Sequence, residues 1–159
     1  SDGTVLIRRA NADDWPAVAS LLAELGRPDV LGTDEEIEAR EVFRSYVRRP
    51  DVVTLVAEEG GRVVGFLDME YRARLNFIAP QAWIPDLIVK EKARSLGIGR
   101  ALLERAEELA RDRGCWGMSL ESAMWRDRAH AFYVREGWQD TGKAFTKVFG
   151  DVTWPPAPR

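Results

Sequence analysis

The stretch from Asp86 to Ala101 reads DLIVKEKARSLGIGRA, and it decides how the rest of the chain is interpreted. An apolar strand ends, a short polar loop follows, and a helix begins within Gly97-Ile98-Gly99. The start of a helix leaves backbone N–H groups without acceptors and carries partial positive charge. Glycines let an anion approach these groups, and Arg94 and Arg100 add cationic donors on each side. The stretch therefore predicts a pyrophosphate site.

A simpler interpretation is a turn with two helix-starting glycines, and a bare G-x-G favours that interpretation. Here the glycines come with a strand before them, an amphipathic helix after them, and Arg94 three residues ahead of Gly97. That combination is more specific than either glycine alone. No Gly-Lys-Ser/Thr follows, so the loop is not a Walker loop, and the third glycine of a dinucleotide fingerprint is missing.

In the rest of the chain, hydrophobic periodicity predicts a mixed α/β architecture with helices on both sheet faces. Asn11 is expected to cap a first helix that reaches Leu25, and Pro85 to force a bulge or an edge in its strand. The other expected elements are strands at 5–7, 52–58, 63–71, 82–89, 116–122 and 144–149, helices at 33–47, 98–110 and 126–136, a hairpin turn at 59–62 and a loop at 72–81. We expect a single domain over 1–150 and an extended or disordered Pro-rich tail over 151–159.

Composition narrows the possible functions. The 159 residues carry a net charge of -3, which is too balanced to favour nucleic acid or an anionic membrane as the main partner. Cys115 is the only cysteine and His130 the only histidine, so an intrachain disulfide and a multi-histidine metal site are excluded. No apolar run approaches the ~20 residues of a membrane span. We expect a cytoplasmic protein with no metal.

Two motifs resemble the GNAT superfamily of acyl-CoA N-acyltransferases. Arg94-Ser95-Leu96-Gly97-Ile98-Gly99 matches the signature Q/R-x-x-G-x-G/A, with Ser95 where many members carry glycine. The segment from Ala129 to Trp138 (AHAFYVREGW) is similar to the family's A-x-x-F-Y-x-x-x-G-F helix. The resemblance extends from Val5 to about Phe149 and includes the order of the elements.

The resemblance implies a mostly antiparallel sheet of six to seven strands that splays between the fourth and fifth strands to admit the pantetheine arm of acetyl-CoA. It makes 82–89 and 116–122 these two strands, with a backbone N–H of Leu87 or Ile88 polarising the thioester carbonyl. The residues implied to bind the co-substrate are Leu87, Ile88, Val89, Arg94, Ser95, Leu96, Gly97, Ile98, Gly99, Arg100, Ala129, Phe132 and Tyr133.

The implied reaction is direct attack of an amine on the thioester, which needs a proton acceptor and an acid for the departing thiolate. The resemblance assigns the acid to Tyr133, whose alternative role is that of a core aromatic residue. Some members carry a glutamate base on the strand before the loop, but the matching position here is Trp83. Glu121 is the preferred base; Asp86, Glu70 and a water chain stay open as alternatives, and we read His130 as a packing or surface residue.

The amine acceptor is a small molecule or a peptide, and the resemblance places its site at about 26–46 and 72–83. Acids between Asp34 and Glu41 suit a cationic amine, whereas Arg72 and Arg74 suit an acceptor that carries a carboxylate. Two alternatives to an N-acetyltransferase stay open: a non-catalytic acyl-CoA-binding module, and a globular protein whose glycines are only structural. A homodimer is possible.

Overall fold

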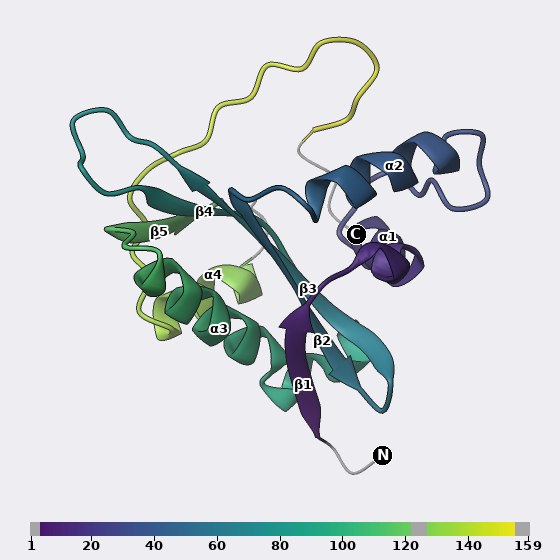
Figure 1. The fold of residues 1–159 in the computed structure, drawn as a ribbon, viewed down its shortest axis with the longest axis horizontal. Coiled ribbons are helices and arrows are strands. Elements are labelled where there is room, and N and C mark those ends of the chain that lie inside the picture. The colour runs from purple at the N-terminus through teal and green to yellow at the C-terminus, as the bar shows by residue number, and fades with distance from the viewer. Residues whose placement is uncertain (1–3, 122–126, 155–159) are drawn as a thin grey trace. The chain divides into compact units, whose positions relative to one another are not determined.

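The computed structural model describes residues 4–121 and 127–154, and of Arg94, Ser95 and Leu96 it describes the backbone only. Along the chain the elements are β1 (Val5–Arg9), η1 (Ala12–Asp14), α1 (Trp15–Glu24), α2 (Glu36–Tyr46), β2 (Val52–Glu59), β3 (Arg62–Arg72), β4 (Gln81–Val89), η2 (Glu91–Leu96), α3 (Ile98–Asp112), β5 (Gly117–Leu120) and α4 (Asp127–Arg135) (Figure 1). Two compact units divide between Ser119 and Leu120, and each is described by itself.

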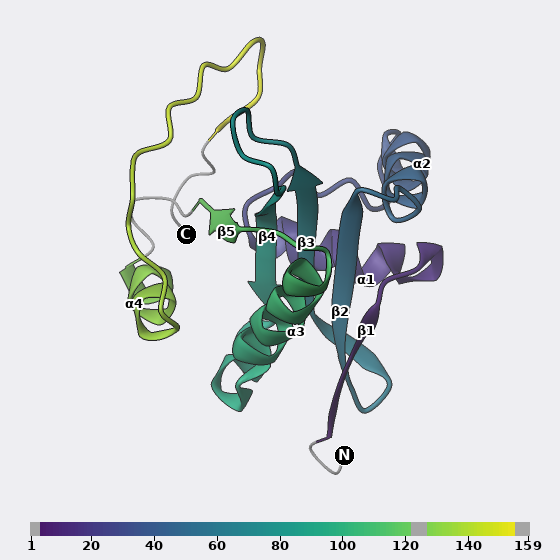
Figure 2. The same cartoon turned by 60° about the vertical axis from the view of Figure 1, so that its left-hand side comes forward.

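The sheet contains five strands in the order β1-β2-β3-β4-β5 among the described residues. The first four strands are antiparallel to their neighbours, while β4 and β5 run parallel. Helices α1 and α2 lie on one face of the sheet and α3 lies on the other (Figure 2). The expected mixed architecture with helices on both faces is therefore confirmed.

Local signals account for several element boundaries. Asn11 accepts a hydrogen bond from Asp13 N at 2.9 Å, and Asp14 Oδ2 accepts from Asn11 N at 2.8 Å, so the predicted N-cap is a full capping box. The hairpin between β2 and β3 turns through Gly60 and Gly61 with φ of 58° and 76°. These positive φ values belong to a type I′ turn, which glycine adopts without a steric cost.

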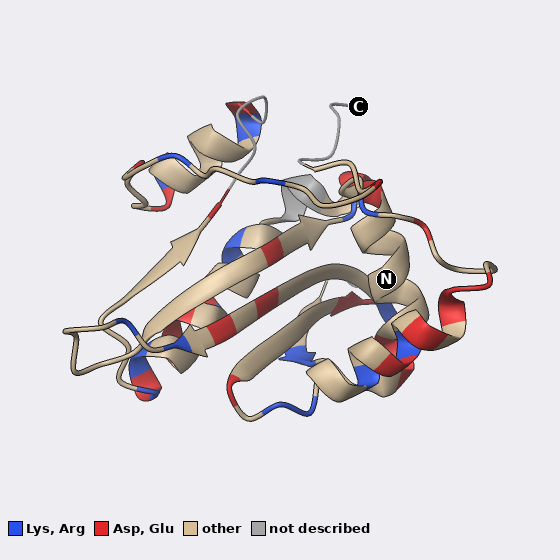
Figure 3. Ribbon diagram, turned by 90° about the horizontal axis from the view of Figure 1, so that it is seen from above, with Lys and Arg blue, Asp and Glu red and all other residues tan. Residues whose placement is uncertain are grey.

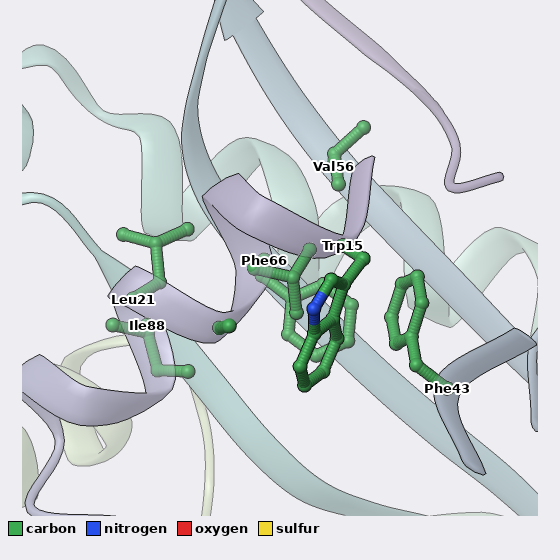
Figure 4. Close-up of a cluster of buried hydrophobic side chains, with 8 residues drawn as sticks. Trp15, Leu21, Phe43, Val56, Phe66 and Ile88 are labelled. Atoms are coloured by element: carbon green, nitrogen blue, oxygen red, sulfur yellow. The ribbon is translucent and has the colours of Figure 1, made fainter. Parts of the chain in front are cut away.

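The core between α1 and the sheet is aromatic and aliphatic. Trp15 and Phe43 bring α1 and α2 together, with ring centroids 5.6 Å apart. Figure 4 shows the side chains of this cluster between α1 and the strands. Its buried members are Trp15, Val18, Ala19, Leu21, Phe43, Val56, Phe66 and Ile88. This cluster fixes α1 and α2 over the face of the sheet that carries Phe66.

Close packing on the opposite face depends on Gly65. A Cβ atom at Gly65 would lie 3.1 Å from Ile98 Cγ2 and 3.1 Å from Leu102 Cδ1. Ile98 and Leu102 are fully buried, so neither can move out into solvent. Glycine therefore lets α3 approach β3 closely, which positions the N-terminal end of α3 beside the end of β4.

The predicted irregularity at Pro85 is confirmed as a bulge between β3 and β4. Asp68 pairs with Asp86 and Glu70 pairs with Trp83, so Ile84 and Pro85 together face one residue of β3. Proline has no backbone N–H to give to the ladder, which explains why the extra residue falls here.

Two predictions differ from the structure, and two predicted boundaries lie outside the described residues. The strand expected at 144–149 is wrong, because the described residues 139–149 form neither helix nor strand. Phe145 and Phe149 are 92% and 84% exposed there. Alternation alone does not make a strand, because its backbone groups need a paired neighbour. The count of six to seven strands is corrected accordingly. Arg72 and Gln81 belong to strands, which shortens the expected loop, and Ser122 and Arg126 lie outside the described residues.

The second unit contains α4, which confirms the helix expected after residue 126. Gly137, with φ of 91°, follows the end of α4, as expected from the sequence. None of the helices in the described part of the chain has the length and apolar character of a membrane span. The expectation of one domain over 1–150 stays a prediction.

Candidate active site

The loop between β4 and α3 ends in a left-handed residue. Gly97 has φ of 72°, and a Cβ there would meet nothing within 4 Å, so the backbone conformation rather than crowding requires glycine. Ala101 N donates to Gly97 O at 3.0 Å and closes the first turn of α3. The N–H groups of Ile98 and Gly99 precede that turn, and helix geometry leaves such groups available to an anion.

The side chains of this loop have different surroundings. Ile98 is fully buried, so only its backbone can serve a ligand. Arg100 is exposed and its Nε donates to Glu104 Oε1 at 3.1 Å. The predicted roles of the Arg94, Ser95 and Leu96 side chains fall outside the described part of the structure. The backbone of these residues forms η2 and leads directly into Gly97.

The backbone at the end of β4 alternates between its two neighbours. Lys90 N donates to Val64 O at 2.8 Å, and the register pairs Phe66 with Ile88. Because alternate residues of an antiparallel strand face the same neighbour, Ile88 N–H points to β3 like Lys90 N–H. The N–H groups of Leu87 and Val89 therefore point away from β3. Of the two N–H groups expected to polarise a thioester carbonyl, that of Leu87 has the suitable direction.

Two carboxylates lie opposite each other on β3 and β4, on the face covered by α1 and α2. Asp68 is 5% exposed and pairs in register with Asp86, which is 8% exposed. Burial, followed by the like charge of Asp86, raises the pKa of Asp68 well above its usual range. Asp86 forms an ion pair with Arg27, which follows α1. The charge of Asp86 is thus balanced by Arg27, whereas Asp68 binds a proton more readily than an ordinary carboxylate does.

Tyr46 at the end of α2 lies over this acid pair. Its hydroxyl donates to Asp68 Oδ2 at 3.0 Å and lies 3.5 Å from Glu70 Oε1. Burial and the charge of Asp68 raise the pKa of Tyr46, so the phenol remains a donor. Arg49 NH1 lies 3.6 Å from Glu70 Oε1. Tyr46 therefore stabilises the ionised form of Asp68, against the effect of burial.

The polar pairs continue along the same face. Glu70 pairs in register with Trp83, Arg72 pairs with Gln81, and the Arg72 guanidinium lies 4.8 Å from the centroid of the Trp83 ring. Acidic bands cross the central strands in Figure 3. The buried polar atoms without a hydrogen-bond partner on this face are Asp68 Oδ1, Arg72 Nε, Gln81 Oε1 and Trp83 Nε1. Such groups are rare in folded proteins and often mark places where a ligand or water binds.

In the second unit, Tyr133 is half-buried on α4 together with Ala129 and Phe132. Its ring centroid lies 5.5 Å from that of Phe132 and 6.1 Å from that of Trp138. Trp138 N donates to Tyr133 O at 3.0 Å and ties the residue after the turn to the helix. The three predicted residues of α4 therefore belong to one half-buried side of the helix.

The other candidate residues have less favourable surroundings. Glu121 is exposed directly after β5. Burial raises the pKa of the half-buried Cys115 thiol, which disfavours a nucleophilic thiolate. Sequence reasoning missed Asp68. A lone acid within Val63-Val64-Gly65-Phe66-Leu67-Asp68-Met69 was the available signal, because carboxylates are rare in apolar strands.

Comparison with known proteins identifies the family. The model of the Acetyltransferase (GNAT) family matches residues 15–138. An aminoalkylphosphonate N-acetyltransferase from Salmonella typhimurium is 32% identical over 143 residues, which cover 89% of this chain and 90% of the relative. A thialysine N-epsilon-acetyltransferase from Bos taurus is 29% identical over 150 residues, covering 88% and 87%.

A solved structure supports the fold. The transcriptional regulator from Bacillus halodurans C-125 superimposes with a TM-score of 0.82 and 24% identity, covering 92% of this chain and all of that chain. The two sequence motifs, the bulged β4 followed by the Gly97 turn, and the family match agree with one another. The chain belongs to the Acetyltransferase (GNAT) family.

Proposed function

We propose that this protein transfers the acetyl group of acetyl-CoA to a primary amine, with the Asp68–Asp86 pair as the proton acceptor. The observation that carries the proposal is the buried acid pair beside Leu87, whose N–H points away from β3. The relatives named above support an amine acceptor, because an aminoalkylphosphonate and thialysine both carry amino groups.

The start of α3 would hold the diphosphate of the co-substrate through backbone N–H groups of Gly97, Ile98 and Gly99. Arg94 and Arg100 would add charge, and Ser95 and Leu96 would contribute backbone groups. Leu87 and Val89 would pair with the pantetheine amides in the manner of an added strand, next to Ile88. The left-handed Gly97 before α3 and the Leu87 N–H, which points away from β3, fit this role.

The acid pair would prepare the amine for attack. A lysine-like amine has a pKa of ~10.4 and is mostly protonated near neutral pH, so its proton must leave first. A carboxylate with a raised pKa accepts this proton more readily than one with an ordinary pKa, which favours Asp68 as the acceptor. The neutral amine nitrogen would then bond to the thioester carbon, the C–S bond would break, and the nitrogen would lose its second proton to water. Leu87 N–H would donate to the carbonyl oxygen as negative charge develops there.

Tyr133 would give its proton to the departing thiolate and regain one from solvent, so the products are an acetamide and free CoA thiol. Phe132 and Ala129 would line the same part of the co-substrate site. The family motif on α4 and the half-buried position of the Tyr133 side chain support this role. A phenol is a suitable acid here because its pKa of ~10 is close to that of an alkyl thiol.

The decisive experiment measures thiol release from acetyl-CoA with a panel of amines. Turnover with at least one amine is expected, and Tyr133→Phe should lower kcat about tenfold to a hundredfold while CoA affinity by calorimetry stays nearly unchanged. Tyr71→Phe is the matched control, because the Tyr71 hydroxyl bonds to Leu109 O at 3.3 Å. CoA binding without turnover on any amine would instead favour a non-catalytic acyl-CoA-binding module, and no CoA binding would refute the proposal.

A further inference from the structure

The face of the sheet under α1 and α2 carries one acid and one base that have no ionic partner among the described residues. Asp86 is paired with Arg27, and Glu70 lies near Arg49. Asp68 and Arg72 remain, four residues apart on the same strand and the same face. Because alternate strand residues share a face, both project to the side on which Tyr46 meets Asp68.

The charged groups at these two places have unsatisfied atoms of opposite kind: an acceptor on Asp68 and a donor on Arg72. Within the described part of the chain, Asp68 Oδ1 is a buried acceptor with no donor, whereas Arg72 Nε and Trp83 Nε1 are buried donors with no acceptor. Leaving such groups unsatisfied costs free energy, so they mark positions where a ligand or water completes the bonding. The acid end would receive a cation and the Arg72 end would receive an anion.

Gln81 has a further unsatisfied group at the Arg72 end, an acceptor that a donor such as water would complete and that an anion would not. It is opposite Arg72 in register and 9% exposed, and its Oε1 is buried without a partner. A buried amide with an open oxygen is not needed for packing the sheet. The Trp83 indole ring lies against the Arg72 guanidinium at the same end, with its centroid 4.8 Å from it.

A ligand that suits both ends carries one ammonium group and one anionic group, because Asp68 lies at one end and Arg72 at the other. A second ammonium group on the ligand would lie near Arg72 and be repelled. An anionic group on the ligand would instead accept charge-assisted hydrogen bonds from the Arg72 guanidinium.

We propose that the acyl acceptor is zwitterionic: its amine binds at Asp68 beside Asp86, and a carboxylate or phosphonate at its other end binds Arg72 and the Trp83 N–H. This inference rests on the proposed function, because the Asp68 end lies in register with the β4 residue before Leu87. Same-face residues of a strand repeat every ~7 Å, and the Arg72 guanidinium lies over Trp83, which pairs with Glu70, so the two charges of the acceptor are separated by about one such repeat. An ω-amino acid with several methylene groups fits better than glycine.

Three ligands of equal chain length test the inference: ε-aminocaproate, n-pentylamine, which lacks the carboxylate, and cadaverine, which carries a second amine. Thiol release should give ε-aminocaproate a kcat/KM about tenfold to a hundredfold above the other two, the range expected for a charge-assisted hydrogen bond. The matching aminopentylphosphonate, run beside it, identifies which anion Arg72 prefers. Calorimetry without acyl donor should show ε-aminocaproate binding with the highest affinity.

Arg72→Gln should remove this preference, lowering kcat/KM for ε-aminocaproate about tenfold or more while leaving n-pentylamine unchanged. Arg72→Lys should retain part of it, because the charge remains. Arg62→Gln is the matched control, since Arg62 is exposed at the hairpin start of β3. Circular dichroism verifies that each variant is folded.

Equal kcat/KM for ε-aminocaproate and n-pentylamine, or an equal loss for both in Arg72→Gln, overturns the inference while the proposed acetyltransferase function stands. Absence of thiol release with every amine refutes the function instead. Calorimetric binding of ε-aminocaproate that depends on Arg72 would still support the zwitterion site in that case.

Discussion

The two faces of β3 differ in what they bury. Gly65, Leu67 and Met69 face α3, where Leu67 and Met69 are fully buried and the glycine sits in close contact with Ile98. Phe66, Asp68 and Glu70 alternate with them on the face toward α1 and α2. The α3 face is packed and apolar, whereas the other face changes from an aromatic core to a row of charged groups.

One face of β3 therefore stabilises the fold, while the other face carries the groups proposed to react. Apolar side chains on the α3 face stabilise the fold through burial and close packing. The acid pair on the opposite face works against folding, because burial opposes the ionised form of Asp68. Natural proteins keep such unfavourable groups mainly at functional sites. Substitutions on the two faces should therefore affect stability and activity in opposite ways.

Asp68→Asn should have the largest effect. Removal of the proton acceptor should lower kcat/KM about a hundredfold or more, within the range for general bases. The same change should raise the free energy of unfolding near neutral pH. The folded-state pKa of Asp68 lies above its unfolded value, so the native state binds more protons between the two values and loses stability as pH rises through that interval. Thiol release and urea titrations at several pH values measure both effects.

Asp86→Asn is the control for this prediction. It leaves Arg27 without its ionic partner and should lower the free energy of unfolding, opposite in sign to Asp68→Asn. An Asp68→Asn protein that is less stable than wild type at neutral pH, or fully active, would show that the acid pair is structural.

Leu55→Ala tests the apolar face of the sheet, which packs against α3. Leu55 is 1% exposed on β2 and pairs with Leu67 in register. Its truncation should cost about 2–5 kcal/mol of stability through lost burial and a cavity. Activity per folded molecule should be unchanged well below the unfolding temperature. Leu6→Ala, at a position 53% exposed, should cost far less. Loss of activity without loss of stability in Leu55→Ala would contradict the separation of roles.

Gly65→Ala should have a smaller effect on the same face. The added methyl group meets Ile98 and Leu102 at 3.1 Å, so α3 must shift or strain at a cost of about 1–3 kcal/mol. Ile98 begins α3, so CoA affinity by calorimetry should also fall. Gly142→Ala, where a Cβ meets nothing within 4 Å, should change neither stability nor affinity. An unchanged unfolding temperature in Gly65→Ala would refute the role given to this contact.

The fold was predictable where its signals are local. Asn11 with Asp14, the two glycines at the β2–β3 hairpin and Pro85 each act within a few residues, and the structure confirms the cap, the turn and the bulge. The strand expected at 144–149 failed because alternation of Phe145 and Phe149 sets which side chains share a face and supplies no partner strand.

The candidate site was only partly predictable for the same reason. Asp86 and Glu70 could be named because they lie next to the loop or at a strand end. Asp68 could not be chosen, because its burial and its position opposite Asp86 depend on the register between β3 and β4. That register includes the bulge at Pro85, whose exact placement no local pattern determines. Predicting the acid pair required knowledge of strand pairing.

Tyr46→Phe should have the smallest effect, and it tests whether Asp68 titrates in the reaction. The Tyr46 hydroxyl donates to Asp68 Oδ2 at 3.0 Å and favours the carboxylate, so its loss should raise the pKa of Asp68 further. Because the base acts in its ionised form, the rising limb of the plot of kcat/KM against pH should move to higher pH. Stability should fall by about 1 kcal/mol at a pH above that limb, where the carboxylate has lost a donor. Tyr71→Phe should leave the limb in place, because the Tyr71 hydroxyl bonds to Leu109 O. A limb that moves to lower pH, or that stays fixed, would mean that Asp68 does not titrate in the reaction.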